Sequence, residues 1–446
     1  MFREFFQNAV WCAYLTLHRG IQSTFIVSVR ALVVATFGLL PMLSAFANED
    51  PIFVVDSSGK AIRTGGSGDC LRTSYWVPYI YSPSCENENR PPPPTSGSSS
   101  IPRPPPPPVP LPVPIPPTTV APKVNANVYP LWYATNRKPE LRNGVVTGYT
   151  ADFDKEMHFG KLEVIVTDDY LKELYKTSFT KKVRMISAES LLQVGSPISL
   201  TGKSFIEQIK ADLSPLPKNE RIALIYIHGF KTTFIEAAQR SASIGYQLKI
   251  PSTTFFSWPS KGTLADYVGD LAQIERSEED IAQFLVKFVR ESGAAEVHLI
   301  AHSMGNWGLL RAMYRPFMQA ALKKGLRFGQ VILAAPDVDM EKFKQDAIAY
   351  KAAAKRITLY ASSNDEALKL SGRLRSFTRA GSTPPILEMT GIDTVDVGAV
   401  NLTLLGHSYV SEEVAVLGDM FDLTSNNTPP AKRFRLRRNG AHWEMR

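Results

Sequence analysis

Ser303 lies in the segment LIAHSMG, where two small residues flank it at fixed spacing. Ala301 precedes it by two positions and Gly305 follows it by two. The apolar run before the serine indicates a buried strand and the residues after it indicate a helix, so Ser303 falls at a sharp strand-to-helix turn. Only small side chains fit beside the central residue of such a turn. The pattern predicts a nucleophilic serine whose hydroxyl is presented at the end of a strand.

A serine that attacks a carbonyl group creates an oxyanion, which needs hydrogen-bond donors. The Met304 N–H stands at the head of the helix that follows Ser303, and we expect it to be one donor. A second donor is expected from the loop after an earlier strand, where ALIYIHGFKTT contains His228, Gly229 and Phe230. We predict that this donor is the Phe230 N–H, that Gly229 lets the backbone approach the substrate, and that His228 is a buried structural histidine.

The nucleophile also needs a histidine base, which follows it in the chain order of this arrangement. His407 and His442 are the histidines after Ser303. His442 lies in a basic C-terminal segment, whereas His407 follows an apolar stretch in NLTLLGHSYV. We therefore expect His407 to be the base.

An acid must orient the base, and the sequence offers several candidates. Asp365 follows the apolar run RITLYASS, which is the position expected after the penultimate strand. Asp337 and Asp339 end the preceding run, QVILAAPDVD, and are the alternatives. Asp339 also suits the N-cap of the next helix. Asp365 is favoured, but only geometry decides which carboxylate reaches the imidazole.

The elements that must position these residues alternate between strand and helix after residue 123. Runs of β-branched and apolar residues without strict alternation predict strands that are buried on both faces. This pattern predicts an α/β fold in which a mostly parallel sheet is flanked by helices. The expected strands are 128–135, 161–167, 221–229, 252–258, 295–303, 330–337 and 356–363, and the expected helices are 234–248, 277–292, 306–325 and 340–355.

Several phrases in this region are specific in combination: LWYATNRKP, YIHGFKTTFIEAA, FFSWPS, LIAHSMGN, LYASSNDEALKLS and GHSYV. Residues 128–422, which contain them, resemble a bacterial α/β-hydrolase family of the esterase/lipase superfamily type whose function is unknown. The resemblance implies a serine hydrolase fold with Ser303, Asp365 and His407 in the triad positions. It does not imply a substrate.

The N-terminal residues 1–47 have the layout of a secretory signal. Three arginines precede or border an apolar run, and the small-residue tripeptide that ends at Ala47 comes before a polar segment. We expect cleavage after Ala47 and export to the periplasm or the outer membrane. The alternative is an uncleaved membrane anchor, because the run is near the lower length limit for spanning a bilayer.

Residues 48–90 form a small segment with two cysteines. If Cys12 is removed with the signal, Cys70 and Cys85 remain. An even number of cysteines in a chain exported to an oxidising compartment predicts a disulfide between these two. The phrases VVDSSGK and SGDCLRTSYWVP, with Cys85, resemble the short cysteine-bearing segment of outer-membrane-protein-A-type proteins. That resemblance implies a Gram-negative cell envelope and possible envelope association.

Three further segments complete the expected organisation. Residues 91–122 are so rich in proline that they predict a stiff spacer in place of helix or sheet. Residues 123–425 are expected to form the hydrolase domain, and residues 426–446 a basic, solvated tail. The formal charge is +8, and the loss of three Arg and one Glu with residues 1–47 lowers it to +6, of which the last sixteen residues supply +5.

The constellation predicts a carboxylic ester hydrolase that acts on a small-molecule or lipid acyl ester, or on a thioester, through an acyl-enzyme. Amide cleavage and acyl transfer would use the same residues, so the substrate stays open. The alternative is an envelope-tethered scaffold with a catalytically silent hydrolase fold. The role of Arg137, either structural or binding a substrate anion, also stays open. No metal or cofactor is expected, because no H-E-x-x-H, C-x-x-C or phosphate-binding glycine loop occurs. No nucleic-acid partner is expected, because the chain is expected to be exported.

Overall fold

The computed structural model describes residues 128–175, 187–261, 266–400 and 407–446, and everything below refers to these residues. They belong to one structural unit of the chain. Three of the expected segments lie outside the described residues: the signal 1–47, the segment 48–90 with Cys70 and Cys85, and the proline-rich linker 91–122.

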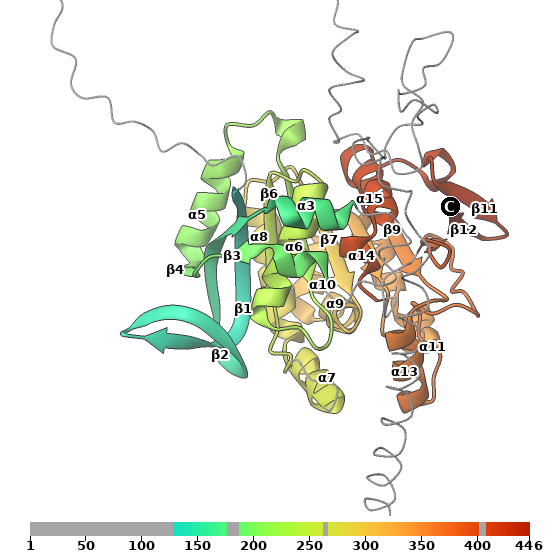
Figure 1. Cartoon of the computed structure of the whole chain (residues 1–446), viewed down its shortest axis with the longest axis horizontal. Helices are drawn as coiled ribbons and strands as arrows, with labels where there is room; N and C mark the ends of the chain where they lie inside the picture. The colour runs from blue at the N-terminus through green and yellow to red at the C-terminus, as the bar shows by residue number, and fades with distance from the viewer. Residues whose placement is uncertain (1–127, 176–186, 262–265, 401–406) are drawn as a thin grey trace, which may run out of the picture. The chain divides into compact units, whose positions relative to one another are not determined.

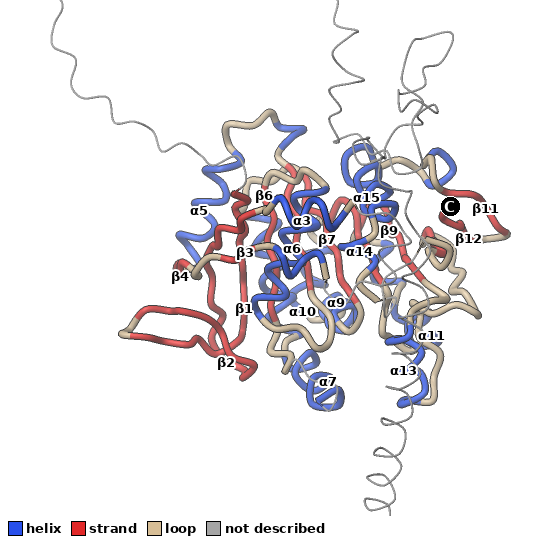
Figure 2. Tube along the Cα trace, in the orientation of Figure 1, coloured by secondary structure: helices blue, strands red, loops and turns tan. Residues whose placement is uncertain are grey.

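A twelve-stranded sheet runs through this unit in the order β11-β12-β10-β9-β8-β7-β5-β6-β1-β2-β3, with β4 paired to β2 (Figures 1 and 2). Every neighbouring pair from β12 to β1 is parallel, and the pairs at both edges are antiparallel. The strands are β1 (Val128–Arg142), β2 (Val145–Ile165), β3 (Gln193–Val194), β4 (Ile198–Leu200), β5 (Ile222–Ile227), β6 (Ser252–Ser257), β7 (Glu296–His302), β8 (Phe328–Ala334), β9 (Ala354–Ala361), β10 (Asp393–Asp396), β11 (Leu436–Asn439) and β12 (His442–Met445).

Helices cover both faces of the parallel strands. Alternate residues of β5 belong to different core clusters, with Ile225 and Ile227 on one face and Leu224 and Tyr226 on the other. The helices are α3 (Asp168–Leu174), α5 (Gly202–Leu213), α6 (Phe234–Gln247), α7 (Tyr267–Arg276), α8 (Glu278–Glu291), α9 (Gly305–Met313), α10 (Pro316–Lys323), α11 (Met340–Asp346), α12 (Ile348–Lys351), α13 (Glu366–Arg375), α14 (Tyr409–Glu412) and α15 (Val414–Asn426). In the part of the chain that is described, none of them has the length and apolar character needed to cross a bilayer.

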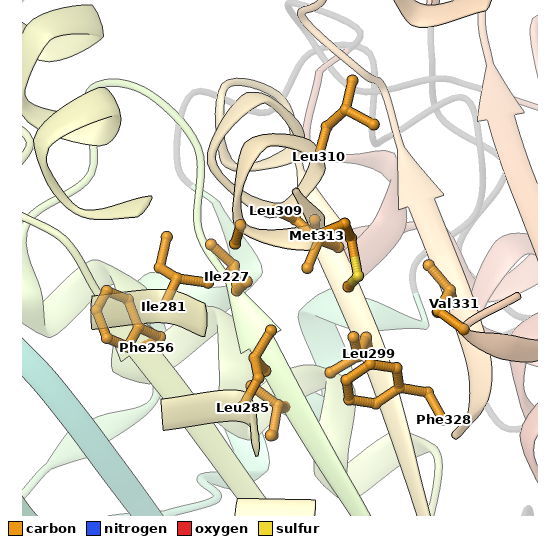
Figure 3. Close-up of a cluster of buried hydrophobic side chains, with 14 of the residues drawn as sticks. Ile227, Phe256, Ile281, Leu285, Leu299, Leu309, Leu310, Met313, Phe328 and Val331 are labelled. Atoms are coloured by element: carbon orange, nitrogen blue, oxygen red, sulfur yellow. The ribbon is translucent and has the colours of Figure 1, made fainter. Parts of the chain in front are cut away.

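One core cluster packs the central strands against α8 and α9 (Figure 3). Apolar residues of β5, β6, β7 and β8 meet side chains at helical spacing on α8 and α9. The labelled residues are Ile227, Phe256, Leu299, Phe328 and Val331 from the strands and Ile281, Leu285, Leu309, Leu310 and Met313 from the helices. This packing anchors β7 and α9, the two elements between which Ser303 lies.

The strand order and the parallel pairing from β12 to β1, with helices on both faces, give the helix-flanked and mostly parallel sheet of α/β-hydrolase type that the sequence predicts.

Two of the expected helices are shorter than predicted. The region 306–325 is two helices, α9 and α10, because Arg315 is extended (φ −65°, ψ 141°) before Pro316. A residue before proline avoids the helical conformation, so the break has a local cause. The region 340–355 also divides, into α11 and α12, and its last residues join β9.

The C-terminal segment 426–446 differs from the solvated tail that we expected. Its strands β11 and β12 extend the sheet, and β12 pairs in parallel with β10. Arg433 is 2% exposed, and its Nη1 lies 2.8 Å from Oδ2 of the buried Asp419 of α15. A cation that neutralises a buried carboxylate is part of the fold, so the basic composition of this segment was misleading.

Candidate active site

Ser303 occupies a tight turn between β7 and α9. Its φ is +53°, in the left-handed region that a non-glycine residue adopts only where its surroundings require it. The Ser303 N–H donates to Ala334 O at 2.9 Å. The side-chain amide of Asn306 donates to the carbonyls of Ala301, Ser303 and Ala334 at 3.0 to 3.1 Å. Sequence reasoning missed Asn306, whose amide holds the turn from inside the protein.

The two glycines beside Ser303 have steric reasons to be glycine. A Cβ on Gly305 would lie 2.4 Å from His228 O, which is main chain and cannot move aside easily. A Cβ on Gly229 would lie 2.7 Å from Ser303 Cβ. The loop after β5 and the turn after β7 are therefore in direct contact.

His407 and Asp365 are brought together from positions 42 residues apart. His407 Nδ1 donates to Asp365 Oδ2 at 2.7 Å, and Asp365 is fully buried. The other oxygen of Asp365 accepts the Leu368 N–H at 2.9 Å, because Asp365 is the N-cap of α13. Both carboxylate oxygens are thus fixed, and the bond at Nδ1 leaves Nε2 of a neutral His407 as the proton acceptor.

The other two candidate acids have different partners. Asp337 accepts hydrogen bonds from the hydroxyls of Tyr267 (2.9 Å) and Ser371 (2.6 Å) and lies 3.3 Å from Arg379 Nε. Asp339 caps α11 by accepting the Lys342 N–H at 2.8 Å, as its position before that helix suggested. Among the described residues, neither of these carboxylates is bonded to His407.

His302 connects Ser303 to the loop of His407. The His302 Nε2–H donates to the main-chain carbonyl of His407 at 2.9 Å, and the two rings lie 4.7 Å apart. Burial and the neighbouring His407 hold the pKa of His302 well below its usual value, so the ring is neutral. Within the described residues, Ser303 Oγ has no hydrogen-bond partner, so the contact to His407 is made through the adjacent residue.

The two expected oxyanion donors lie in segments that touch, since Met304 is in the turn and Phe230 follows Gly229, whose added Cβ would lie 2.7 Å from Ser303 Cβ. Among the residues that the structure describes, no acceptor is bonded to the Phe230 or the Met304 N–H. His228 Nδ1 donates to Gly229 O at 2.8 Å, and the Trp258 indole N–H donates to His228 O at 2.8 Å. Burial holds the pKa of His228 well below its ordinary value. His228 therefore has the structural role that the sequence suggested.

Arg137 stabilises the loop after β5, which contains Phe230 and Thr232. Its guanidinium is buried and donates to the carbonyls of Thr232 (2.7 Å), Ser260 (3.1 Å) and Thr150 (3.1 Å) and to the Ser257 hydroxyl (2.8 Å). With its donors engaged by protein groups, Arg137 is structural and does not present its charge to a substrate.

Several solved hydrolase structures are similar to this chain. A predicted CIB-like hydrolase from Thermoplasma acidophilum shares 18% identity over 47% of this chain and 89% of that chain, with a TM-score of 0.27. Aspergillus fumigatus lipase B shares 12% over 48% of this chain and 54% of that chain, with a TM-score of 0.30. A lipase-esterase related protein from Clostridium acetobutylicum shares 11% over 47% and 96%, with a TM-score of 0.26.

Comparison with curated proteins finds no match to this chain. A family model described as "Alpha/beta hydrolase of unknown function (DUF900)" does match, over residues 203–423. The matched region contains the turn at Ser303, the loop of Phe230 and the paired Asp365 and His407. Residues 203–423 are therefore similar to this family of alpha/beta hydrolases of unknown function.

Proposed function

We propose that this protein is an exported serine hydrolase that cleaves an ester or a thioester through a covalent acyl-enzyme. The observation that carries the proposal is the 2.7 Å hydrogen bond between His407 and Asp365, beside a turn that holds Ser303 at positive φ. A neutral imidazole fixed at Nδ1 by a buried carboxylate is suited to accept a proton at Nε2.

The proposed reaction uses the chain's own groups. Ser303 Oγ attacks the acyl carbon while its proton passes to His407 Nε2, and the N–H groups of Phe230 and Met304 bind the oxyanion. The carbon–oxygen or carbon–sulfur bond then breaks, and His407 returns the proton to the departing alcohol or thiol. Water activated by His407 releases the acid and restores Ser303. Asp365 stabilises the imidazolium in both steps.

The hydrogen bond from Ser303 Oγ to His407 Nε2 is expected to form when substrate binds. Such bonds are often long or absent in free enzymes and shorten in the complex. The His302 contact keeps the loop of His407 next to the turn that carries Ser303.

The activated serine can be tested with a fluorophosphonate and intact mass measurement. Wild type should gain one adduct, and Ser303→Ala should gain none. Ser214→Ala is a matched control, because that residue is exposed and its hydroxyl bonds to Ala211 O at 3.0 Å; it should label like wild type. A folded wild-type protein that does not react would instead favour a catalytically silent scaffold. If the adduct forms, acyl esters of increasing chain length would define the substrate.

Export is a separate part of the proposal, and it rests on the charge and apolar pattern of residues 1–47. N-terminal sequencing of protein from a cell envelope fraction should begin at Asn48. A chain that begins at Met1 and stays in the membrane would support the uncleaved anchor.

A further inference from the structure

Helix α13 presents large apolar side chains to solvent. Leu370 and Leu374 are 44% and 65% exposed, and their spacing of four residues places them on one side of the helix. Phe377, which is 61% exposed, follows the end of the helix at Arg375 and its left-handed C-cap at Ser376. Leu368 and Ser371, on the opposite side, are buried against the protein. Surface helices normally show the reverse pattern, so the outward face of α13 suggests a contact with another apolar phase.

Basic side chains accompany this apolar face. From Glu366 to Phe377 the segment carries three cations, Lys369, Arg373 and Arg375, and one acid. The acid, Glu366, is paired with Lys369 at 2.7 Å. Arg373 is exposed and lies three residues after Leu370, whereas Arg375 lies seven residues after the buried Leu368 and so on the inner side of the helix. A helix of this composition is complementary to a surface with anionic headgroups above an apolar layer.

The exposed face lies at the candidate active site. Asp365, which holds His407, is the N-cap of α13. The Tyr267 hydroxyl, at the start of α7, lies 2.9 Å from Ser371 Oγ on the inner side of α13, and the next residue, Val268, is 79% exposed. Figure 1 shows α7, α11 and α13 at the same end of the sheet. A surface that contacts α13 would therefore lie next to the site.

We propose that the outward face of α13, together with Phe377 just after the helix, docks on an anionic lipid surface. Leu370, Leu374 and Phe377 enter the boundary between headgroups and acyl chains, and Arg373 binds a lipid phosphate. Docking uses residues that take no part in the proposed chemistry, so it can be tested whether or not Ser303 is a nucleophile.

Co-sedimentation of the full chain with lipid vesicles tests the proposal. At low ionic strength, wild type should bind vesicles of phosphatidylglycerol and phosphatidylcholine more tightly than vesicles of phosphatidylcholine alone. Leu374→Ser combined with Phe377→Ser should weaken binding about tenfold or more, and Arg373→Gln about fivefold. Ser303→Ala should bind like wild type, which separates docking from catalysis.

Two variants are matched controls. Ile235 on α6 is 43% exposed, close to the 44% of Leu370, and Arg290 is an exposed arginine in the last turn of α8, as Arg373 is in α13. Ile235→Ser and Arg290→Gln should leave vesicle binding unchanged.

Two results would overturn the proposal. One is binding of the α13 variants that equals wild type while all remain folded by circular dichroism. The other is a wild-type dimer in sedimentation velocity without lipid that Leu374→Ser and Phe377→Ser convert to monomer, since a second copy of the chain would then cover this face.

Discussion

His302 donates its Nε2–H to the main-chain carbonyl of His407 at 2.9 Å, so the residue before the proposed nucleophile holds the residue proposed as its base. His302 Nδ1 is buried and has no hydrogen-bond partner in the described part of the chain. The ring therefore serves as a single donor, and its evident function is to position the loop of His407. This relationship leads to the first prediction.

Replacement of His302 should reduce turnover more than substrate binding. In His302→Ala the loop of His407 loses its anchor, and we expect kcat to fall about tenfold to hundredfold with little change in KM. His302→Gln, whose amide can donate at a similar position, should recover part of the rate. Steady-state kinetics on a soluble ester would measure both. A loss confined to thermal stability, with kcat unchanged, would show that the contact is only structural.

Replacement of Asp365 should separate it from the other two candidate acids. Asp365→Asn keeps the size of the side chain but removes the charge that stabilises the imidazolium, so kcat/KM should fall by between about 10²-fold and 10⁴-fold. Asp339→Asn is the control, because asparagine is an equally good N-cap, and its activity should match wild type. An Asp339→Asn enzyme as impaired as Asp365→Asn would refute this assignment.

Gly305→Ala should disrupt the turn at Ser303. The new Cβ would lie 2.4 Å from His228 O, and we expect a loss of about 1–3 kcal/mol in the free energy of unfolding together with loss of activity. Gly269→Ala in α7 is the contrast, since no atom lies within 4 Å of its added Cβ. That change should stabilise the protein by about 0.5–1 kcal/mol. Urea unfolding of both variants would measure the expected decrease for Gly305→Ala and the expected increase for Gly269→Ala in the free energy of unfolding.

The buried histidines should make the protein less stable as the pH falls below 6.5. Burial lowers the pKa of His298 from 6.5 to about 4, and it also lowers the pKa values of His228 and His302. Between about pH 6.5 and 4 the unfolded chain binds protons that the folded chain does not, so stability is full above 6.5 and declines with acid.

Each such histidine contributes up to about 1.4 kcal/mol per pH unit in this window. Urea unfolding at pH 7 and at pH 5 measures the difference. His298→Asn should reduce the slope of the free energy of unfolding against pH by the amount that corresponds to about one bound proton. A pH dependence of His298→Asn that equals that of wild type would contradict the buried, neutral state of His298.

Arg433→Met should test whether the C-terminal segment belongs to the fold. Asp419 is buried beside Arg433 and also accepts the Tyr360 hydroxyl at 2.7 Å. Removal of one partner of a buried ion pair leaves the other charge uncompensated, and we expect a loss of about 3–5 kcal/mol in the free energy of unfolding. Arg437→Met, at an exposed position of β11, is the control and should change stability by less than about 0.5 kcal/mol.

The sequence by itself determined the features that depend on neighbouring residues. The apolar strands, the turn at Ser303 between Ala301 and Gly305, and the Asp339 cap of α11 all follow from local sterics and hydrogen bonding. The break between α9 and α10 could also be predicted from the sequence, because Pro316 restricts the conformation of the residue before it.

Only the tertiary structure decided which distant groups meet. Asp337, Asp339 and Asp365 all lie near strand ends, and the choice of Asp365 as the partner of His407 depends on how β9 and the chain after β10 are placed. The contacts of His302 and Asn306 and the pairing of Arg433 with Asp419 likewise join residues whose proximity the packing creates. A local pattern carries little information about such contacts, because they depend on the arrangement of the whole sheet.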